Sequence, residues 1–185
     1  MKAKYLLILL IPIFIISFNL NFLIFNYNFY NNNDVNDNLL NYFKDKEELK
    51  FNYTEREYIH LNDVKSLINI LEIIVYVLLL LILIIIFYDF DIEKILIISG
   101  LITIGIIFIL VIFNFGFLFT KFHEVLFVND YWLLPEDSLL IKTYPIEFFT
   151  GFFKRLVLNI GITSLIVIVL GILKNVHTKH KSSAN

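Results

Sequence analysis

Four long apolar segments, separated by polar stretches, dominate the hydrophobic pattern of the chain. They lie at about 5–26, 66–88, 94–117 and 152–173. Each has roughly the 20 residues that an α-helix needs to cross the hydrocarbon core of a bilayer. β-Strands of this length do not span lipid as open hairpins, because their edge groups would stay unpaired. The pattern predicts an all-α fold: a four-helix transmembrane bundle that forms a single integral membrane domain over residues 1–185.

The first apolar segment has two interpretations. Lys2 and Lys4 precede it, as they would in a secretory signal. However, no small-x-small cleavage site follows, and the sequence continues with NYNFYNNN. We therefore interpret the segment as a retained membrane anchor. Pro12 is compatible with this, because membrane helices accept proline more readily than soluble helices do.

The positive charges close to the span ends favour a topology with both termini in the cytoplasm. Lysines and arginines near the ends of a span are the ones that orient it. Lys2 and Lys4 flank the first span, and Lys174, Lys179 and Lys181 follow the fourth. A pair of basic residues at the other end of the fourth span, Lys154 and Arg155, argues against this orientation.

With both termini inside, two outer loops carry most of the polar residues. These loops are 27–65 and 118–151, whereas the inner connection at 89–93 is only a tight turn. Within the first loop, apolar residues alternate with charged ones over 39–51, which predicts a short helix lying on the surface. We therefore expect the polar, structured part of the protein, with its short helices, on the extracytoplasmic side.

The composition agrees with a membrane protein and excludes several kinds of site. The chain is 58% hydrophobic and 17% charged, against about 45–50% and about 25% in soluble domains, and its mean hydropathy is +0.77. A net charge of −2 provides no basic surface for nucleic acid. Because there is no cysteine, disulfides, thiolate nucleophiles and cysteine metal ligands are excluded.

Polar residues inside the spans fall on two helix faces. Intervals of three and four residues place one set on the second span and another on the fourth: Lys65, Asn69, Glu72 and Tyr76, then Arg155, Asn159 and Thr163. Because charges are the costly case within a bilayer, we expect Glu72 and Arg155 to form an intramembrane ion pair at a site. Ordinary hydrogen-bonded contact between helices is the alternative, and it is preferred for Asn19, Asn21 and Thr163. The span glycines are interpreted as points of close packing: Gly100, Gly105, Gly161 and Gly171.

Two of the four histidines lie where a span meets an outer loop. His60 precedes the second span and His123 follows the third. Carboxylates are near each in the sequence: Glu55, Glu57 and Asp63 for the first, Glu124 and Asp130 for the second. A histidine titrates near neutral pH and can act as general base and then as acid. A structural role and a zinc site stay open as alternatives, although no H-E-x-x-H spacing supports zinc. The other two, His177 and His180, belong to a Lys-rich tail that is interpreted as solvated.

Three segments resemble those of one protein family. They are NYF at 41–43, EREYIHLNDVKSLI at 55–68 and FHEVLFVNDYWLLPEDSLLIKTYPIEFF at 122–149. The shared pattern is E-R-x-x-x-H-x-x-D-V-K before a helix, F-H-x-x-x-F-x-N-x-x-W, then a Pro and an Asp, and finally P-x-x-F-F before the last helix. With these motifs the chain resembles, over essentially its whole length, the small bacterial membrane family that includes the lipoprotein intramolecular transacylase.

The resemblance implies a reaction in the outer leaflet of the cell membrane. The substrate would be a diacylated lipoprotein whose N-terminal cysteine carries a thioether-linked diacylglyceryl group. One ester-linked acyl chain would move to the α-amino group of that cysteine, giving a lyso-form N-acyl lipoprotein. The implied partners are this lipoprotein and membrane lipids, with no cofactor, metal or nucleic acid, and the oligomeric state stays open.

The resemblance also places the chemistry on the two histidine segments. We expect His123 to be the general base and His60 a second catalytic group, with Glu124 or Asp130 orienting the His123 ring. A covalent acyl-histidine stays open. The residues expected to hold the substrate or stabilise the oxyanion are Asp63, Lys65, Asn69, Glu72, Asn129, Tyr131, Trp132, Asp137 and Arg155. For the aromatic residues Tyr131, Trp132, Phe148 and Phe149, the alternative is an interfacial aromatic belt.

Three other functions compete with the transferase. A membrane scaffold or accessory subunit would depend on its helix faces and not on His123. A lipid hydrolase would differ only in using water as the acyl acceptor, which the sequence does not distinguish. A transporter is disfavoured, because the chain shows no internal repeat and no interrupted span.

Overall fold

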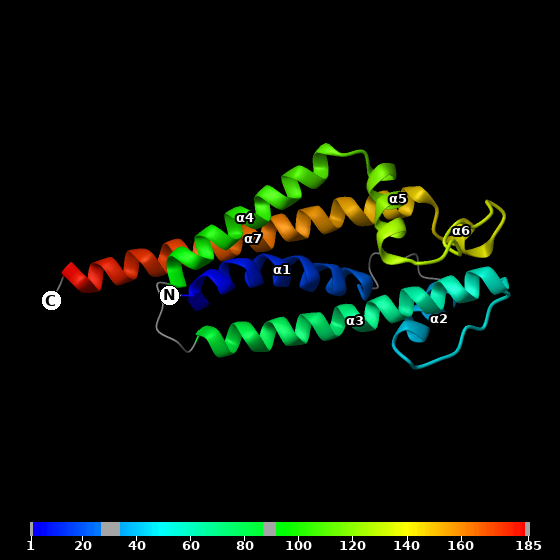
Figure 1. Cartoon of the computed structure of the whole chain (residues 1–185), viewed down its shortest axis with the longest axis horizontal. Coiled ribbons are helices and arrows are strands. Elements are labelled where there is room, and N and C mark those ends of the chain that lie inside the picture. The colour runs from blue at the N-terminus through cyan, green and yellow to red at the C-terminus, as the bar shows by residue number, and fades with distance from the viewer. Residues whose placement is uncertain (1, 27–33, 87–91, 184–185) are drawn as a thin grey trace. The chain divides into compact units, whose positions relative to one another are not determined.

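The computed structural model of the chain describes residues 2–26, 34–86 and 92–183, and helices are the only regular elements in this described part. This confirms the predicted all-α class. Figure 1 shows the helices in chain order: α1 (Lys2–Ile24), α2 (Asp34–Phe43), α3 (Glu55–Ile86), α4 (Ile92–Ile112), α5 (Phe115–Leu126), α6 (Leu139–Thr143) and α7 (Ile146–Ser183).

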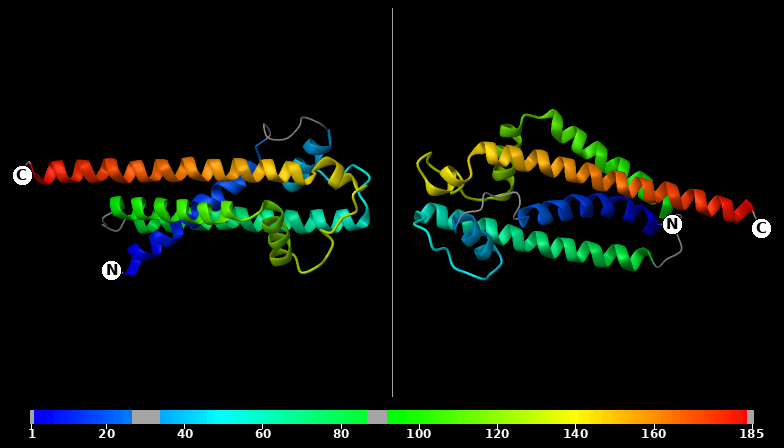
Figure 2. Two further views of the ribbon diagram at one scale, coloured as in Figure 1. Left: turned by 90° about the horizontal axis from the view of Figure 1, so that it is seen from above. Right: turned by 180° about the vertical axis from the view of Figure 1, so that it is seen from behind.

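Four of these helices, α1, α3, α4 and α7, are long and apolar enough to cross a membrane. This confirms the four predicted membrane helices. Two are longer than the apolar runs from which they were predicted: α3 begins at Glu55, within the expected outer loop, and α7 continues without a break to Ser183 (Figure 2). A hydropathy pattern identifies only the apolar part of a helix, the part that fits a bilayer. It does not indicate that the same helix continues into a polar segment.

A capping box explains why α3 begins so early. The Thr54 backbone amide donates to Glu57 Oε2 at 2.8 Å, and the Glu57 amide donates back to Thr54 Oγ1 at 3.3 Å. This reciprocal pair satisfies amides that the first turn of a helix leaves without partners. The second carboxylate oxygen of Glu57 accepts from the backbone amide of Leu140 at 2.7 Å. The fully buried Glu57 therefore joins the start of α3 to α6.

The third predicted span ends earlier than expected. Hydrophobicity continues to about residue 117, but α4 ends at Ile112 and a separate helix, α5, follows. Asn114 starts the new helix, because its side chain accepts from the Gly116 amide at 2.8 Å in an extended, N-capping conformation. An asparagine favours this position over a helix interior.

The chain divides into two compact units, which we describe separately. The span unit comprises Met1–Leu20, Ile73–Ile112 and Leu156–Asn185, and the loop unit comprises Asn21–Glu72 and Phe113–Arg155. The span unit therefore contains α4, the larger parts of α1 and α7, and the part of α3 from Ile73 onward. The loop unit contains α2, α5 and α6, the first part of α3, and the adjoining ends of α1 and α7.

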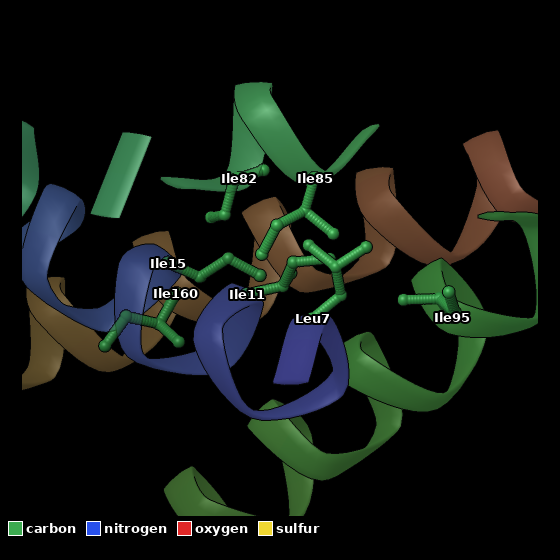
Figure 3. Packing of buried hydrophobic residues seen from close by; sticks show 7 residues of the cluster. All are labelled: Leu7, Ile11, Ile15, Ile82, Ile85, Ile95 and Ile160. Carbon is green, nitrogen blue, oxygen red and sulfur yellow. The ribbon is translucent and has the colours of Figure 1, made fainter. Parts of the chain in front are cut away.

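Branched aliphatic side chains fill the core of the span unit (Figure 3). Leu7, Ile11 and Ile15 recur every four residues and so lie on one face of α1. They pack with side chains of the other three membrane helices: Ile82 and Ile85 of α3, Ile95 of α4 and Ile160 of α7. Lipid is as apolar as these residues, so close packing and not exclusion from water holds such helices together.

Hydrogen bonds reinforce the packing between helices. Asn19 Nδ2 of α1 donates to the Ile15 carbonyl at 2.8 Å and lies 3.2 Å from Thr163 Oγ1 of α7. The predicted role of Asn19 and Thr163 in joining helices is thus confirmed. Asn21 differs, because its buried Nδ2 has no hydrogen-bond partner among the described residues.

Two of the four span glycines are needed for close approach. A Cβ on Gly171 would lie 2.7 Å from the Glu93 carbonyl oxygen, and one on Gly100 would lie 2.5 Å from the Ile168 side chain. A Cβ on Gly105 would meet nothing within 4 Å, and one on Gly161 would make only an ordinary contact at 3.8 Å. The close-packing interpretation is confirmed for Gly100 and Gly171 and is wrong for Gly105.

The loop unit has a core of its own, in which α2 packs on the first half of α3 (Figure 1). Its buried members are Leu39, Tyr42, Phe43, Leu61, Ile68 and Tyr144. The Tyr144 hydroxyl, just after α6, donates to Asn36 Oδ1 of α2. These contacts, with the Glu57 bonds, fix the part of α3 that carries His60.

Replacing Gly171 by alanine is expected to destabilise the protein, because the new methyl group meets a backbone carbonyl that cannot rotate away. Overpacking of this kind costs about 1–3 kcal/mol. The midpoint of thermal unfolding of the purified protein in detergent measures the effect, with Gly105→Ala as the matched control. Equal midpoints for the two variants would contradict the close approach of α4 and α7.

Candidate functional site

The structure brings His60 and His123 together. His60 lies on the first part of α3 and His123 near the end of α5, and their ring centroids are 6.0 Å apart. Both rings are buried, with exposed fractions of 7% and 9%. Two histidines that are 63 positions apart in the chain (123 − 60) therefore form one cluster within the loop unit.

A backbone carbonyl determines which nitrogen of the His123 ring carries the proton. Nδ1 lies 2.7 Å from the carbonyl oxygen of Phe119, one helical turn earlier. Because a carbonyl only accepts, Nδ1 must carry the proton, and in a neutral ring Nε2 then has a free lone pair. Burial lowers the pKa of His123 below its ordinary value, although the bond to Phe119 acts in the opposite direction. Burial therefore favours the neutral form of the ring, whose Nε2 can accept a proton.

His60 presents a buried polar atom with no partner. Its Nδ1 has no hydrogen-bond partner among the described residues, while its ring packs edge-on against Phe127 with centroids 5.1 Å apart. Buried polar atoms in proteins are almost always satisfied, so such an exception calls for an explanation. A ring nitrogen kept without a partner is available to a ligand.

Aromatic rings enclose His123 on several sides. The ring centroids of Phe119, Phe122, Phe127 and Trp132 lie 4.3, 5.4, 5.4 and 5.0 Å from that of the histidine. Phe119 packs in turn on Phe149 at 5.2 Å. Such walls lower the local dielectric constant and strengthen hydrogen bonds formed inside them. Trp132, expected to contact substrate, packs directly on the proposed base.

Asp63, Asn129 and Tyr131 link the two histidine segments. Asn129 Nδ2 donates to Asp63 Oδ2 at 2.9 Å, and Asn129 Oδ1 accepts from the Tyr131 amide at 3.0 Å. Asp63 lies about one helical turn after His60 on α3. The chain of bonds therefore runs from the helix that carries His60 to the turn that precedes Trp132.

Arg56 makes a second link, which the sequence reasoning had not singled out. Its guanidinium donates to the Asp130 carbonyl and lies over the Tyr131 ring, 5.6 Å from the centroid. Glu57, noted only as an acidic neighbour of His60, holds α6 as described above. The capping pattern T-x-x-E at 54–57 was the sequence signal for Glu57, but no signal indicated what Arg56 would contact.

The carboxylates expected to orient His123 do not contact it. Glu124 forms an ion pair with Lys121 at 2.5 Å on the exposed side of α5. Asp130 contributes its backbone carbonyl to Arg56, and its side chain is exposed. The orienting partner is the Phe119 carbonyl, because residues four apart on a helix share a face and adjacent residues do not. This corrects the orienting role given to Glu124 or Asp130.

The remaining expected residues lie outside the histidine cluster. Lys65 pairs with Asp45 Oδ1 at 2.7 Å and lies 4.1 Å from the centre of the Tyr42 ring, so it fastens α2 to α3. The side chains of Asn69, Asp137 and Arg155 are exposed. Although Glu72 and Arg155 both lie in described parts of the chain, no ion pair joins them, and that expectation is wrong.

The described residues contain no group of three or more His, Asp and Glu side chains that could hold a metal ion. What the structure places in the cluster is two imidazole rings and a set of apolar walls.

The sequence model of the family described as "Lipoprotein intramolecular transacylase Lit" matches residues 33–149, which is more than half of the 185-residue chain. A comparison with curated proteins gave no match.

Solved structures of one protein share the fold. The membrane integral lipoprotein intramolecular transacylase Lit from Bacillus cereus matches with a TM-score of 0.82 at 20% identity, covering 98% of this chain and 99% of that one. A variant of that protein with one histidine replaced by alanine matches with a TM-score of 0.77 at 19% identity, covering 98% and 94%. At this level of identity the likeness concerns the fold.

The matched region includes both histidines, Asp63 and Asn129, and the four apolar helices make this a multi-pass membrane protein. The chain belongs to the lipoprotein intramolecular transacylase family.

Proposed function

We propose that this protein is a membrane acyltransferase that moves an ester-linked acyl chain of a diacylglyceryl-modified lipoprotein to the α-amino group of its N-terminal cysteine. Family membership supports the substrate class. The observation that carries the chemistry is the bond between His123 Nδ1 and the Phe119 carbonyl. It leaves Nε2 of a buried, neutral ring as the base.

An α-amino group has an unperturbed pKa of about 7.7–8.0, so it is largely protonated at neutral pH and must first release one proton to solvent to become the neutral amine. In the proposed reaction, His123 Nε2 then takes a second proton from the amine nitrogen as that nitrogen bonds to the ester carbonyl carbon. The carbonyl oxygen becomes an oxyanion. The C–O bond to glycerol breaks, and the imidazolium of His123 returns its proton to the leaving oxygen. The products are an amide and a free glycerol hydroxyl.

His60 is assigned to the oxyanion. Its ring is 6.0 Å from that of His123, and a neutral imidazole has one N–H to donate. A donor directed at the developing charge within an apolar enclosure is worth about 2.7–4 kcal/mol in comparable sites. The unsatisfied Nδ1 supports this assignment, because a ligand atom would complete its hydrogen bonding.

The substrate contacts are proposed on the same basis. Tyr131 and Asn129 lie at the turn before Trp132, where they would contact the glycerol and cysteine portion of the lipid. Arg155 is a more distant candidate, because no described contact joins it to the cluster. Donor and acceptor belong to one molecule, so the main task of the site is to hold the amine against the ester, and such orientation is worth several kcal/mol.

The topology of the reaction is part of the proposal. Both termini are placed in the cytoplasm and the loop unit on the outer face, on the basis of the charges near the span ends. The two histidines then meet the headgroups of the outer leaflet, where processed lipoproteins are anchored.

A lipid hydrolase would use the same groups with water as acceptor. The aromatic rings around His123 favour the transferase, because they restrict the access of water to the base. A scaffold would not require a base, so loss of the imidazole discriminates between the enzyme and the scaffold.

The position of the acyl chain tests the function. The protein is expressed in a bacterium that makes only diacylated lipoproteins, and the N-terminal peptide of one lipoprotein is fragmented by tandem mass spectrometry. Intramolecular transfer leaves the total mass unchanged, so fragments must locate the chain on nitrogen or oxygen. We expect transfer by the wild type and a loss of at least about 100-fold for His123→Ala, in line with removal of a general base.

His177→Ala, at an exposed position in the last turns of α7, is the matched control and should transfer as the wild type does. Equal activity of the two variants would exclude His123 as the base. Loss of the acyl chain from the peptide would identify a hydrolase.

The neutral state of His123 has a measurable consequence for stability. Because burial lowers its pKa in the folded protein, the unfolded chain binds more protons near and below the ordinary value of about 6.5. The stability that the neutral His123 ring contributes to the folded protein is fully present above that pH and is lost as the pH falls through the pKa of the folded state. We expect the unfolding temperature to fall between about pH 7 and pH 5 more steeply for the wild type than for His123→Gln, whose amide does not titrate. Parallel curves would show that the ring is not buried in its neutral form.

Exchanging the partners tests whether the Asp63–Asn129 bond positions the site. Asn129→Asp sets two carboxylates against each other and should lower activity by roughly 10- to 100-fold through displacement of the turn before Trp132. The double variant Asp63→Asn with Asn129→Asp restores one donor and one acceptor and should recover most of it. Emission from Trp132, the only tryptophan, reports the turn directly. If emission recovers and activity does not, one of these residues contacts the substrate.

A further inference from the structure

The helix α5 has three distinct faces. One is turned into the loop unit and carries Phe119 and His123. A second is polar and carries the exposed ion pair of Lys121 with Glu124. The third is apolar and exposed, and we call it the α5 stripe: Phe122, Val125 and Leu126, continued after the helix by Val128. The first three lie within one helical turn and so share a face.

The exposure of the α5 stripe requires an apolar environment. Val125 is 80% exposed, and Val128 is fully exposed, with an exposed fraction of 106%. Isolated exposed apolar residues are ordinary, but a contiguous set beside a polar face marks a surface that meets lipid or a partner. The division of one helix into a protein face, an apolar face and a charged face is typical of helices that lie at a membrane surface.

The position of α5 in the chain indicates lipid as the occupant. It begins at Phe115, almost immediately after α4, which is apolar enough to span a membrane and ends at Ile112. A helix that follows a span so closely starts at the level where the hydrocarbon ends. Tyr131 and Trp132 nearby are the residue types that gather at that level.

We propose that α5 lies in the membrane–water interface, with the α5 stripe among the outer acyl-chain segments of the lipids and the pair of Lys121 and Glu124 toward water. Phe122 belongs to the stripe and also packs edge-on against the His123 ring, with centroids 5.4 Å apart. The stripe therefore adjoins the face that carries the proposed base. If the proposed function holds, which this last step requires, an acyl chain approaches His123 laterally from the bilayer along Phe122.

Fluorescence quenching tests the location without any turnover. Because Trp132 is the only tryptophan, Trp132→Phe gives a background in which one new tryptophan can be read alone. Val125→Trp places it on the α5 stripe, and Glu124→Trp places it on the polar face of the same helix, because consecutive residues diverge by about 100°. Both are reconstituted in phosphatidylglycerol vesicles in which one acyl chain is brominated close to its ester, and aqueous iodide is the second quencher.

We expect the Val125→Trp protein to be quenched several-fold more by the brominated lipid than by iodide, with blue-shifted emission, and the Glu124→Trp protein to show the reverse. Phe122→Trp repeats the stripe position if Val125→Trp does not fold. Quenching of the stripe tryptophans by iodide alone, or equal lipid quenching at positions 124 and 125, would overturn the proposal. Lipid quenching at the stripe together with unimpaired transfer by His123→Ala would leave the interface intact and refute the proposed function.

Discussion

The loop unit holds two buried histidine rings side by side among aromatic side chains, and much of its structure serves this arrangement. A charged imidazole would be costly against Phe119, Phe122 and Phe127, so the ring of His123 is held neutral, with one nitrogen bonded to a backbone carbonyl. The bond comes from the regular geometry of α5 and needs no carboxylate. Because this bond fixes the proton on Nδ1, Nε2 of the neutral ring is the nitrogen that can accept a proton.

The supporting contacts divide into two sets with different tasks. Glu57 satisfies the first turn of α3 and holds α6, which fixes where His60 lies. Asp63 and Arg56, on the same helix, reach the turn between α5 and α6 through Asn129 and the Asp130 carbonyl. Both sets start from the first turns of α3, so the polar extension of this membrane helix organises the cluster. The two histidine segments are held to one another by polar bonds at their edges and by aromatic packing at their centre.

Much of this could be predicted from the sequence, and the failures have physical reasons. Apolar runs of membrane length revealed the four spans, and the motifs around His60 and His123 marked both as candidate residues, but the sequence did not show that the two rings lie together. Hydropathy could not separate α4 from α5, because the phenylalanines of an interfacial helix score like those of a span. Nearness in sequence suggested Glu124 as the partner of His123, but consecutive residues on a helix diverge by about 100°. The predicted ion pair of Glu72 with Arg155 was wrong because helix periodicity shows which residues share a face of one helix and does not show which helix faces contact each other.

The unbroken length of α3 has a mechanical consequence. Its 32 residues give a rod of about 48 Å at 1.5 Å per residue, whereas the bilayer core is about 30 Å thick. His60 is carried on the same rod as the apolar segment that must match that thickness. In a bilayer of longer lipids the rod has to tilt less or draw inward, and either change alters the height of His60 relative to the glycerol esters. The lipid chain length of the host membrane thereby becomes a determinant of how the histidine cluster would meet the substrate proposed for it.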